Sequence, residues 1–304
     1  MEKLGLSYEK LHTLNPKLVY GALRGFGDSR TKASPYAKYP SYDVIAQAMG
    51  GLMGVSGPDA QTPIKAGPGL GDILPGMLLA FGVLSAIHHA KATGQGQFVD
   101  IAMADAVLYA SERIVYQHSI TKKVPQSTGN MHPFLSPFGL FEAKDGHITI
   151  AAPDDSLFEK LCKALDATAM LSDAKFSKAV NRRDNRVELE ERLNALTKKF
   201  TKQELMDRLG GLVPNGPVMN MEEIKADTHF QAREMVVPVD IPELDATIDI
   251  VGVPIKMSET PGEIKQRAPF HGEHTEEVLR AAGVEEETIQ KVKHTRVDFS
   301  RFLK

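Results

Sequence analysis

Two carboxylates occupy positions from which they could do chemistry. Asp72 lies in Gly69-Leu-Gly-Asp-Ile-Leu-Pro-Gly76, where a glycine-rich stretch meets an apolar segment. Aspartate is a preferred N-cap, because its side chain accepts a hydrogen bond from the first turn of a helix, and this is its commoner role at such a junction. A carboxylate on a tight turn, beside glycines that leave room for a ligand, is also a candidate covalent nucleophile. A helix N-terminus would stabilise that anion without a counter-ion.

Asp43 is the second carboxylate, in Tyr42-Asp-Val-Ile-Ala-Gln47. Its ordinary role is that of a first-turn acid, stabilised by the dipole of its helix. Together with Asp72 it could divide the work between a nucleophile and a polar positioning group. The spacing of 29 positions does not tell whether the two side chains meet.

The sequence lacks the motifs that are typical of metal sites and of phosphate-binding loops. No His-Glu-x-x-His motif occurs among the ten histidines, and His271-Gly-Glu-His274 has no further acid or cysteine nearby, so we expect no metal site. The glycines form neither a Walker pattern nor Gly-x-Gly-x-x-Gly with a trailing acid. Cys162, the single cysteine, lies in a helical pattern and is typical of a small core residue.

Composition narrows the function classes further. The 304 residues include 36 basic and 39 acidic side chains, a formal charge of -3, so no positive excess points to nucleic acid. One cysteine fits a reducing compartment, and no apolar run after Met1 resembles a secretory signal. The longest apolar stretch, 73–87, is broken by proline and glycine and is too short to span a bilayer. We therefore expect a cytoplasmic protein that binds neither nucleic acid nor membrane, with residues 73–87 as a helix covered on several sides.

Alternating elements in the first 121 residues predict an α/β layer with a largely parallel sheet. Strands are expected over 18–23 and 98–103, and helices over 42–52 and 73–87. A cluster of Lys, Pro, Ser, Gly and Asn at 122–137 indicates a linker. After it we expect a hairpin at 138–141 and 147–151, helices at 156–165, 187–198 and 202–209, and a turn at 213–217. Strands at 236–241 and 248–255 and a helix at 273–282 follow.

Several motifs in order along the chain resemble the class III CoA-transferases, the family of formyl-CoA transferase, carnitine CoA-transferase and α-methylacyl-CoA racemase. The matching segments are 15–20, 25–27, 71–76, 91–107, 129–133, 213–218, 254–258 and 271–275. The resemblance implies a Rossmann-like large domain with a parallel sheet and a smaller α+β domain, in an interlocked dimer. It divides the chain into a large domain (1–121), the linker (122–137), a small domain (138–222) and a return to the large domain (223–304).

The resemblance also implies roles for individual residues. Asp72 matches the family's nucleophilic aspartate, and Asp43 falls where formyl-CoA transferase has a catalytic glutamate. We expect Tyr42, Gly69, Gly71 and Gly76 to line the CoA thioester, which is a substrate, with no tightly bound cofactor. The implied reaction moves CoA between an acyl-CoA and a small carboxylic acid, through an aspartyl-acyl anhydride on Asp72, in a homodimer.

Two departures from the family keep alternatives open. The racemase relatives carry a histidine base where this chain has Tyr42, so a transferase is preferred over a racemase or epimerase. Family members begin with about a hundred further residues that hold CoA contacts and a catalytic glutamine. A catalytically inactive or partner-dependent subunit is therefore the alternative from another class. The family's glycine lid is replaced by 131–137, Met-His-Pro-Phe-Leu-Ser-Pro.

Overall fold

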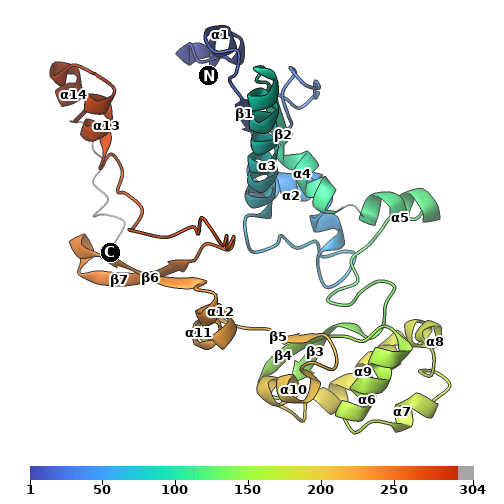
Figure 1. Cartoon of the computed structure of the whole chain (residues 1–304). Helices are drawn as coiled ribbons and strands as arrows, with labels where there is room; N and C mark the ends of the chain where they lie inside the picture. Colours follow the sequence, from blue (N-terminus) through green and yellow to red (C-terminus); the bar gives the residue numbers. More distant parts are fainter. Residues whose placement is uncertain (112, 294–304) are drawn as a thin grey trace. The chain divides into compact units, whose positions relative to one another are not determined.

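Two units make up the chain, Met1–Val218 and Met219–Lys304. The structure, a computed structural model (Figure 1), describes residues 1–111 and 113–293. The first unit ends directly after the predicted turn at 213–217. The predicted four-part domain division, including the return of 223–304 to the large domain, stays a prediction, and residues 294–304 lie outside the described part.

A parallel pair of strands organises the N-terminal half. Strand β1 (Tyr20–Arg24) pairs with β2 (Phe98–Ala102) in parallel, with Tyr20 opposite Phe98 and Arg24 opposite Ala102. Parallel neighbours need a long crossover connection, and here it contains helices α2 (Asp43–Met49) and α3 (Leu70–Thr93). The expected α/β layer with a parallel sheet is confirmed.

Helix α3 packs along both strands of this pair. An added Cβ at Gly21 of β1 or at Gly82 of α3 would lie 3.0 Å from a valine methyl group across the interface. These two glycines therefore let the helix lie close to the sheet. Helix α4 (Met103–Ala110) follows β2 directly and packs against α2 and α3.

The extent and covering of α3 differ from expectation. The helix has 24 residues and continues through Pro75, because contacts with the sheet stabilise it against one lost backbone hydrogen bond. By length and composition it could cross a membrane, so the statement that this stretch is too short was wrong. Only 17% of its most apolar window is buried within the described residues, and Met77, Phe81 and Leu84 are exposed, so the expected covering on several sides is also not observed.

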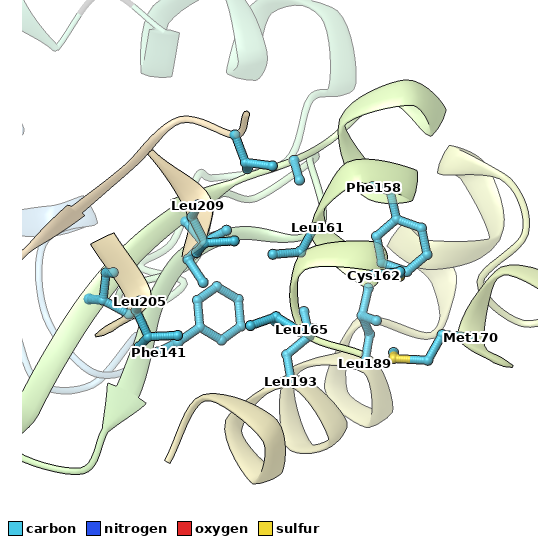
Figure 2. Packing of buried hydrophobic residues seen from close by; sticks show 14 of the residues in the cluster. Phe141, Phe158, Leu161, Cys162, Leu165, Met170, Leu189, Leu193, Leu205 and Leu209 are labelled. Atoms are coloured by element: carbon cyan, nitrogen blue, oxygen red, sulfur yellow. The ribbon is translucent and has the colours of Figure 1, made fainter. Parts of the chain in front are cut away.

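The second half of this unit is a small α+β domain with its own core (Figure 2). Strands β3 (Phe138–Ala143) and β4 (Gly146–Ala151) form the predicted hairpin, and β5 (Asn215–Pro217) adds an antiparallel third strand. The prediction of a plain turn at 213–217 was wrong for its last three residues, because β4 offers them a free edge. Phe141, Phe158, Leu161 and Leu193 are among the buried side chains of the core.

Three helices of the small domain lie within one residue of their predicted bounds. They are α6 (Asp155–Ala164), α9 (Arg186–Thr197) and α10 (Lys202–Leu209). Five α-helices in the described part of this unit were not predicted: α1 (Tyr8–Leu14), α4, α5 (Arg113–Thr121), α7 (Ala169–Ser172) and α8 (Ala179–Asp184). Residues 122–137, the predicted linker, contain no helix or named strand.

The second unit consists of short helices and one hairpin. Helices α11 (Met221–Ala226) and α12 (Thr228–Ala232) precede β6 (Val236–Ile241) and β7 (Ala246–Val251), which pair antiparallel. The first strand is as predicted, and the second begins two residues and ends four residues earlier than the predicted range 248–255. Helices α13 (Thr275–Ala281) and α14 (Glu286–Lys293) follow. Arg267 forms ion pairs with Glu243, which lies between the two strands of the hairpin, and with Glu273, which lies just before α13.

Candidate active site

Asp43 is held through both of its carboxylate oxygens. It is the first residue of α2, and its Oδ1 accepts hydrogen bonds from the Gly71 N–H at 2.8 Å and the Gln47 Nε2 at 2.9 Å. Its Oδ2 forms an ion pair with the Lys65 Nζ at 3.1 Å. The side chain is 15% exposed. Because both oxygens have partners, the orientation of this carboxylate is set by the fold.

The same contacts keep Asp43 ionised. The hydrogen bond from Gln47, then that from Gly71 and the charge of Lys65, lower the pKa of the Asp43 carboxyl, and they outweigh desolvation, which acts in the opposite direction. Donors that point at a carboxylate favour its charged form. Asp43 therefore carries a negative charge at neutral pH.

Gly71 brings the start of α3 against α2. A Cβ at this position would lie 2.5 Å from the Asp43 carbonyl oxygen and 3.0 Å from the Ala46 Cβ, distances that real side chains do not tolerate. Only glycine allows this close approach. The hydrogen bond from Gly71 to Asp43 exists because of it.

Asp72 is not the N-cap of its helix, and that expectation was wrong. Helix α3 starts at Leu70 with Gly69 as its N-cap, which places Asp72 in the first turn. The capping acceptor comes instead from another helix, because Asp43 receives the Gly71 N–H. The Asp72 side chain is exposed, and it makes no hydrogen bond or ion pair within residues 1–111 and 113–293. Its carboxylate is free to react, and the helix N-terminus favours its negative charge.

Both carboxylates lie beside Gly69. A Cβ built on Gly69 would lie 3.6 Å from the Asp72 Oδ2 and 3.9 Å from the Asp43 Oδ1. The fold thus places the two carboxylates on either side of one glycine, although 29 positions separate them in the sequence.

Tyr42 and Gly76 flank this arrangement. Tyr42 occupies the N-cap position of α2, and 78% of it is exposed. Gly76 lies four residues after Asp72 on α3, and a Cβ there would meet no atom within 4 Å. The contacts of Tyr42, Gly69, Gly71 and Gly76 with a CoA thioester stay predictions.

Gln47 and Lys65 are site residues that the sequence reasoning missed. Gln47 is fully buried; its Nε2 also donates to the Pro68 carbonyl at 3.3 Å, and its Oε1 accepts the Ala66 N–H at 3.0 Å. The spacing of Asp43 and Gln47, four residues apart on a helix, was a readable signal. Lys65 lies in a loop, and no local pattern connects it with Asp43.

The segment Gly129–Pro133, one of those that resemble the family, does not line the region around Asp43 and Asp72. It lines a hollow of about 610 Å³ together with Arg113 and Phe138, and neither Asp43 nor Asp72 lines that hollow. Burial, and secondarily the charge of Arg113, lower the pKa of His132 there. Across the described part of the chain, no three His, Cys, Asp or Glu side chains are grouped so that they could hold a metal ion.

The geometry at Asp72 supports covalent chemistry on a carboxylate. A nucleophile must be accessible and ionised, and the groups around it must be fixed. Asp72 is accessible at the start of α3, while Asp43, Gln47 and Lys65 form a connected network behind it. Of the two carboxylates, Asp72 is therefore free of partners among the described residues, and Asp43 is engaged through both oxygens.

Comparisons with known proteins agree on one family. The sequence model of CoA-transferase family III matches residues 1–275. The succinyl-CoA:mesaconate CoA-transferase of Haloarcula hispanica is 43% identical over 284 residues, which are 93% of this chain and 71% of that protein. The succinate–glutarate CoA-transferase of Agrobacterium fabrum is 36% identical, over 96% of this chain and 71% of that protein. The crystal structure of a CAIB/BAIF family protein from Brucella suis is similar with a TM-score of 0.78 and 30% identity, covering 92% of this chain and 72% of that one.

Proposed function

This chain belongs to CoA-transferase family III, and we propose that it transfers CoA from a short acyl-CoA to a free dicarboxylic acid through an anhydride on Asp72. One observation carries the mechanism. Of the two carboxylates beside Gly69, Asp43 is engaged on both oxygens and Asp72 is exposed without a partner among the described residues. The free carboxylate is the one that can attack a thioester.

The reaction proceeds through exchanges of acyl groups between oxygen and sulfur. An oxygen of Asp72 attacks the thioester carbonyl; the C–S bond breaks, CoA leaves as a thiolate, and an aspartyl-acyl anhydride remains. The acceptor carboxylate takes the acyl group from Asp72, and the resulting free mixed anhydride reacts back with Asp72 through its other carbonyl, releasing the donor acid. The CoA thiolate then attacks the new aspartyl anhydride, which gives the product thioester and regenerates the Asp72 carboxylate. Each step exchanges one activated acyl bond for another.

Asp43 serves as the fixed partner of this nucleophile. It accepts the Gly71 N–H and so holds the first turn of α3, on which Asp72 lies. Its engaged oxygens are poorly available for attack on a thioester. Asp43 therefore positions Asp72 and does not form the anhydride.

The names of the relatives suggest the substrate class. Both reported transferases are named for dicarboxylic acids, succinate with mesaconate and succinate with glutarate. Succinyl-CoA and mesaconate are accordingly the first pair to test, because the relative named for them is 43% identical. Racemisation has less support, since Tyr42 stands at the position of the racemase base and a neutral phenol is a weak base.

A direct assay tests the proposal. The purified chain is incubated with succinyl-CoA and a panel of mono- and dicarboxylic acids, and acyl-CoA products are separated by liquid chromatography. Hydroxylamine added during turnover should convert Asp72 to a hydroxamate, which mass spectrometry of peptides detects. Products without any label on Asp72, or labelling of Asp43 instead, would reject the anhydride mechanism. Exchange of the α-proton of a 2-methylacyl-CoA at a rate near turnover would favour the racemase.

We propose a homodimer as the assembly. Support comes from the pair β1–β2 and the exposed apolar side chains of α3, because parallel strands are normally covered on both faces. Light scattering at micromolar concentration should give twice the mass of the chain. A monomer that becomes active only with another polypeptide would favour the partner-dependent subunit.

A further inference from the structure

The Lys65 ammonium makes three contacts within the site. Its Nζ donates to the carbonyls of Ala66 at 2.8 Å and Gly67 at 3.2 Å, and it forms the ion pair with the Asp43 Oδ2 at 3.1 Å. A lysine ammonium has three N–H donors and no acceptor. All three contacts of the Lys65 ammonium are with groups of the site, so Lys65 can act on the reaction through the groups that it holds.

Lys65 supplies the one partner of the Asp43 Oδ2 within residues 1–111 and 113–293. The other oxygen, Oδ1, carries the bonds from Gln47 and Gly71. Without the ammonium, the carboxylate could rotate, and its negative charge would face Asp72 without compensation. Lys65 is 37% exposed, so solvent reduces this attraction without removing it.

Lys65 also anchors the turn that leads into α3. The carbonyls of Ala66 and Gly67 bind Lys65, while the N–H of Ala66 and the carbonyl of Pro68 bind the buried Gln47. The next residue is Gly69, the N-cap of α3. The turn and Asp43 are thereby held together immediately before Asp72.

The charged side chains on the other elements that pack against α2 and α3 either have partners outside the site or make no ion pair with it. Arg24 of β1 pairs with Asp28, and Asp100 of β2 accepts from the Asp28 N–H and the Thr31 hydroxyl. Asp105 of α4 is exposed, and no ion pair joins it to the site in the described part of the chain. Within the described part of the chain, Lys65 is thus the cation that contacts Asp43.

We infer that Lys65 is a positioning residue of the transfer reaction, which compensates the charge of Asp43 and fixes the 66–68 turn so that Asp72 faces the thioester. This inference rests on the proposed function. It assigns a role to a residue that neither the motif pattern nor the family resemblance singled out.

The first test compares Lys65→Met and Lys65→Arg with the wild-type chain. Lys160→Met is the matched control, because Lys160 is an exposed lysine on α6 of the small domain. We expect Lys65→Met to lose about 10–100-fold in kcat, as expected for a misplaced nucleophile. The acid limb of its kcat/KM profile should move to higher pH, because Asp43 loses a neighbouring positive charge. Lys65→Arg should recover most of both, and Lys160→Met should match the wild type.

The second test does not depend on activity. Carboxyl carbons of aspartate are labelled with ¹³C, the Asp43 signal is assigned with Asp43→Asn, and its titration is followed by NMR. The Asp43 midpoint should be higher in Lys65→Met than in the wild type and in Lys160→Met. Thermal unfolding and the remaining NMR signals establish that each variant is folded.

The outcomes separate the two proposals. An unchanged Asp43 midpoint in Lys65→Met, or equal kcat in Lys65→Met and Lys160→Met, would overturn the role of Lys65. A wild-type chain that is inactive with every acid overturns the proposed function instead, and the carboxyl titration still decides whether Lys65 controls Asp43.

Discussion

Replacement of Gly71 with alanine tests the close contact of α2 and α3. The new Cβ would lie 2.5 Å from the Asp43 carbonyl oxygen and 3.0 Å from the Ala46 Cβ, so the two helices must separate. Overpacking of this kind costs about 1–3 kcal/mol. The hydrogen bond from Gly71 to the charged Asp43 weakens as well, at a cost of about 1 kcal/mol. Alanine returns up to about 1 kcal/mol of helix propensity, so the net loss of stability is about 2 kcal/mol.

Gly76 provides the control within the same helix. It is exposed, and an added Cβ would meet no atom within 4 Å. Gly76→Ala should therefore stabilise the protein by about 0.5–1 kcal/mol, because alanine loses less conformational entropy than glycine in a helix. Two identical substitutions five residues apart should thus have opposite signs.

Thermal unfolding followed by circular dichroism measures the difference. For a unit of roughly 220 residues, about 1 kcal/mol corresponds to about 2–4 °C in Tm, so Gly71→Ala should unfold about 4–8 °C lower than the wild type. Gly76→Ala should unfold at the same temperature or slightly higher. If Gly71→Ala proved as stable as Gly76→Ala, the close approach of the helices and the capping of α3 by Asp43 would both be refuted.

Three further predictions concern single side chains. Asp72→Asn should abolish transfer and hydroxylamine labelling. Its Tm should stay within about 1 °C of the wild-type value, because the exposed carboxylate caps no helix. A large fall in Tm would indicate that Asp72 caps α3 after all. The pKa of Asp43 is lowered in the folded state, so its ionised form contributes stability above pH 4, and this contribution is lost as the pH falls through the folded-state pKa. Between pH 4 and 2 the wild type should therefore lose more free energy of unfolding than Asp43→Asn. Parallel plots of unfolding free energy against pH for the two proteins would contradict this. Burial raises the pKa of the Cys162 thiol to about 11, so iodoacetamide at pH 7.5 should label it only after unfolding, as mass spectrometry would show.

Local patterns predicted much of the secondary structure. The strands β1, β2 and β6 and the hairpin β3–β4 follow from β-branched and apolar runs bounded by glycine or charged turns. Helices α6, α9 and α10 follow from apolar residues at helical spacing. These elements are determined by neighbours in sequence, and the structure places them within a few residues of the predicted bounds.

Errors occurred where a distant segment decided the conformation. Asn215–Pro217 reads as a turn by itself, and it becomes a strand because β4 offers its free edge. Asp72 reads as an N-cap, and it lies in the first turn because Asp43, on another helix, accepts the Gly71 N–H. In both places a long-range hydrogen bond replaced the local one that the pattern suggested.

The sequence by itself determined the family, the parallel α/β arrangement and the two candidate carboxylates, because motifs and periodicity are local properties of the chain. Only the tertiary structure decided that Asp43 and Asp72 both lie beside Gly69, and that Asp43 is held by partners while Asp72 has none among the described residues. Gln47 could be connected with Asp43 through helical spacing, whereas Lys65 lies in an irregular loop. The path of such a loop depends on the backbone and side-chain bonds that close it, and here those bonds run between Lys65, Gln47 and the 66–68 turn.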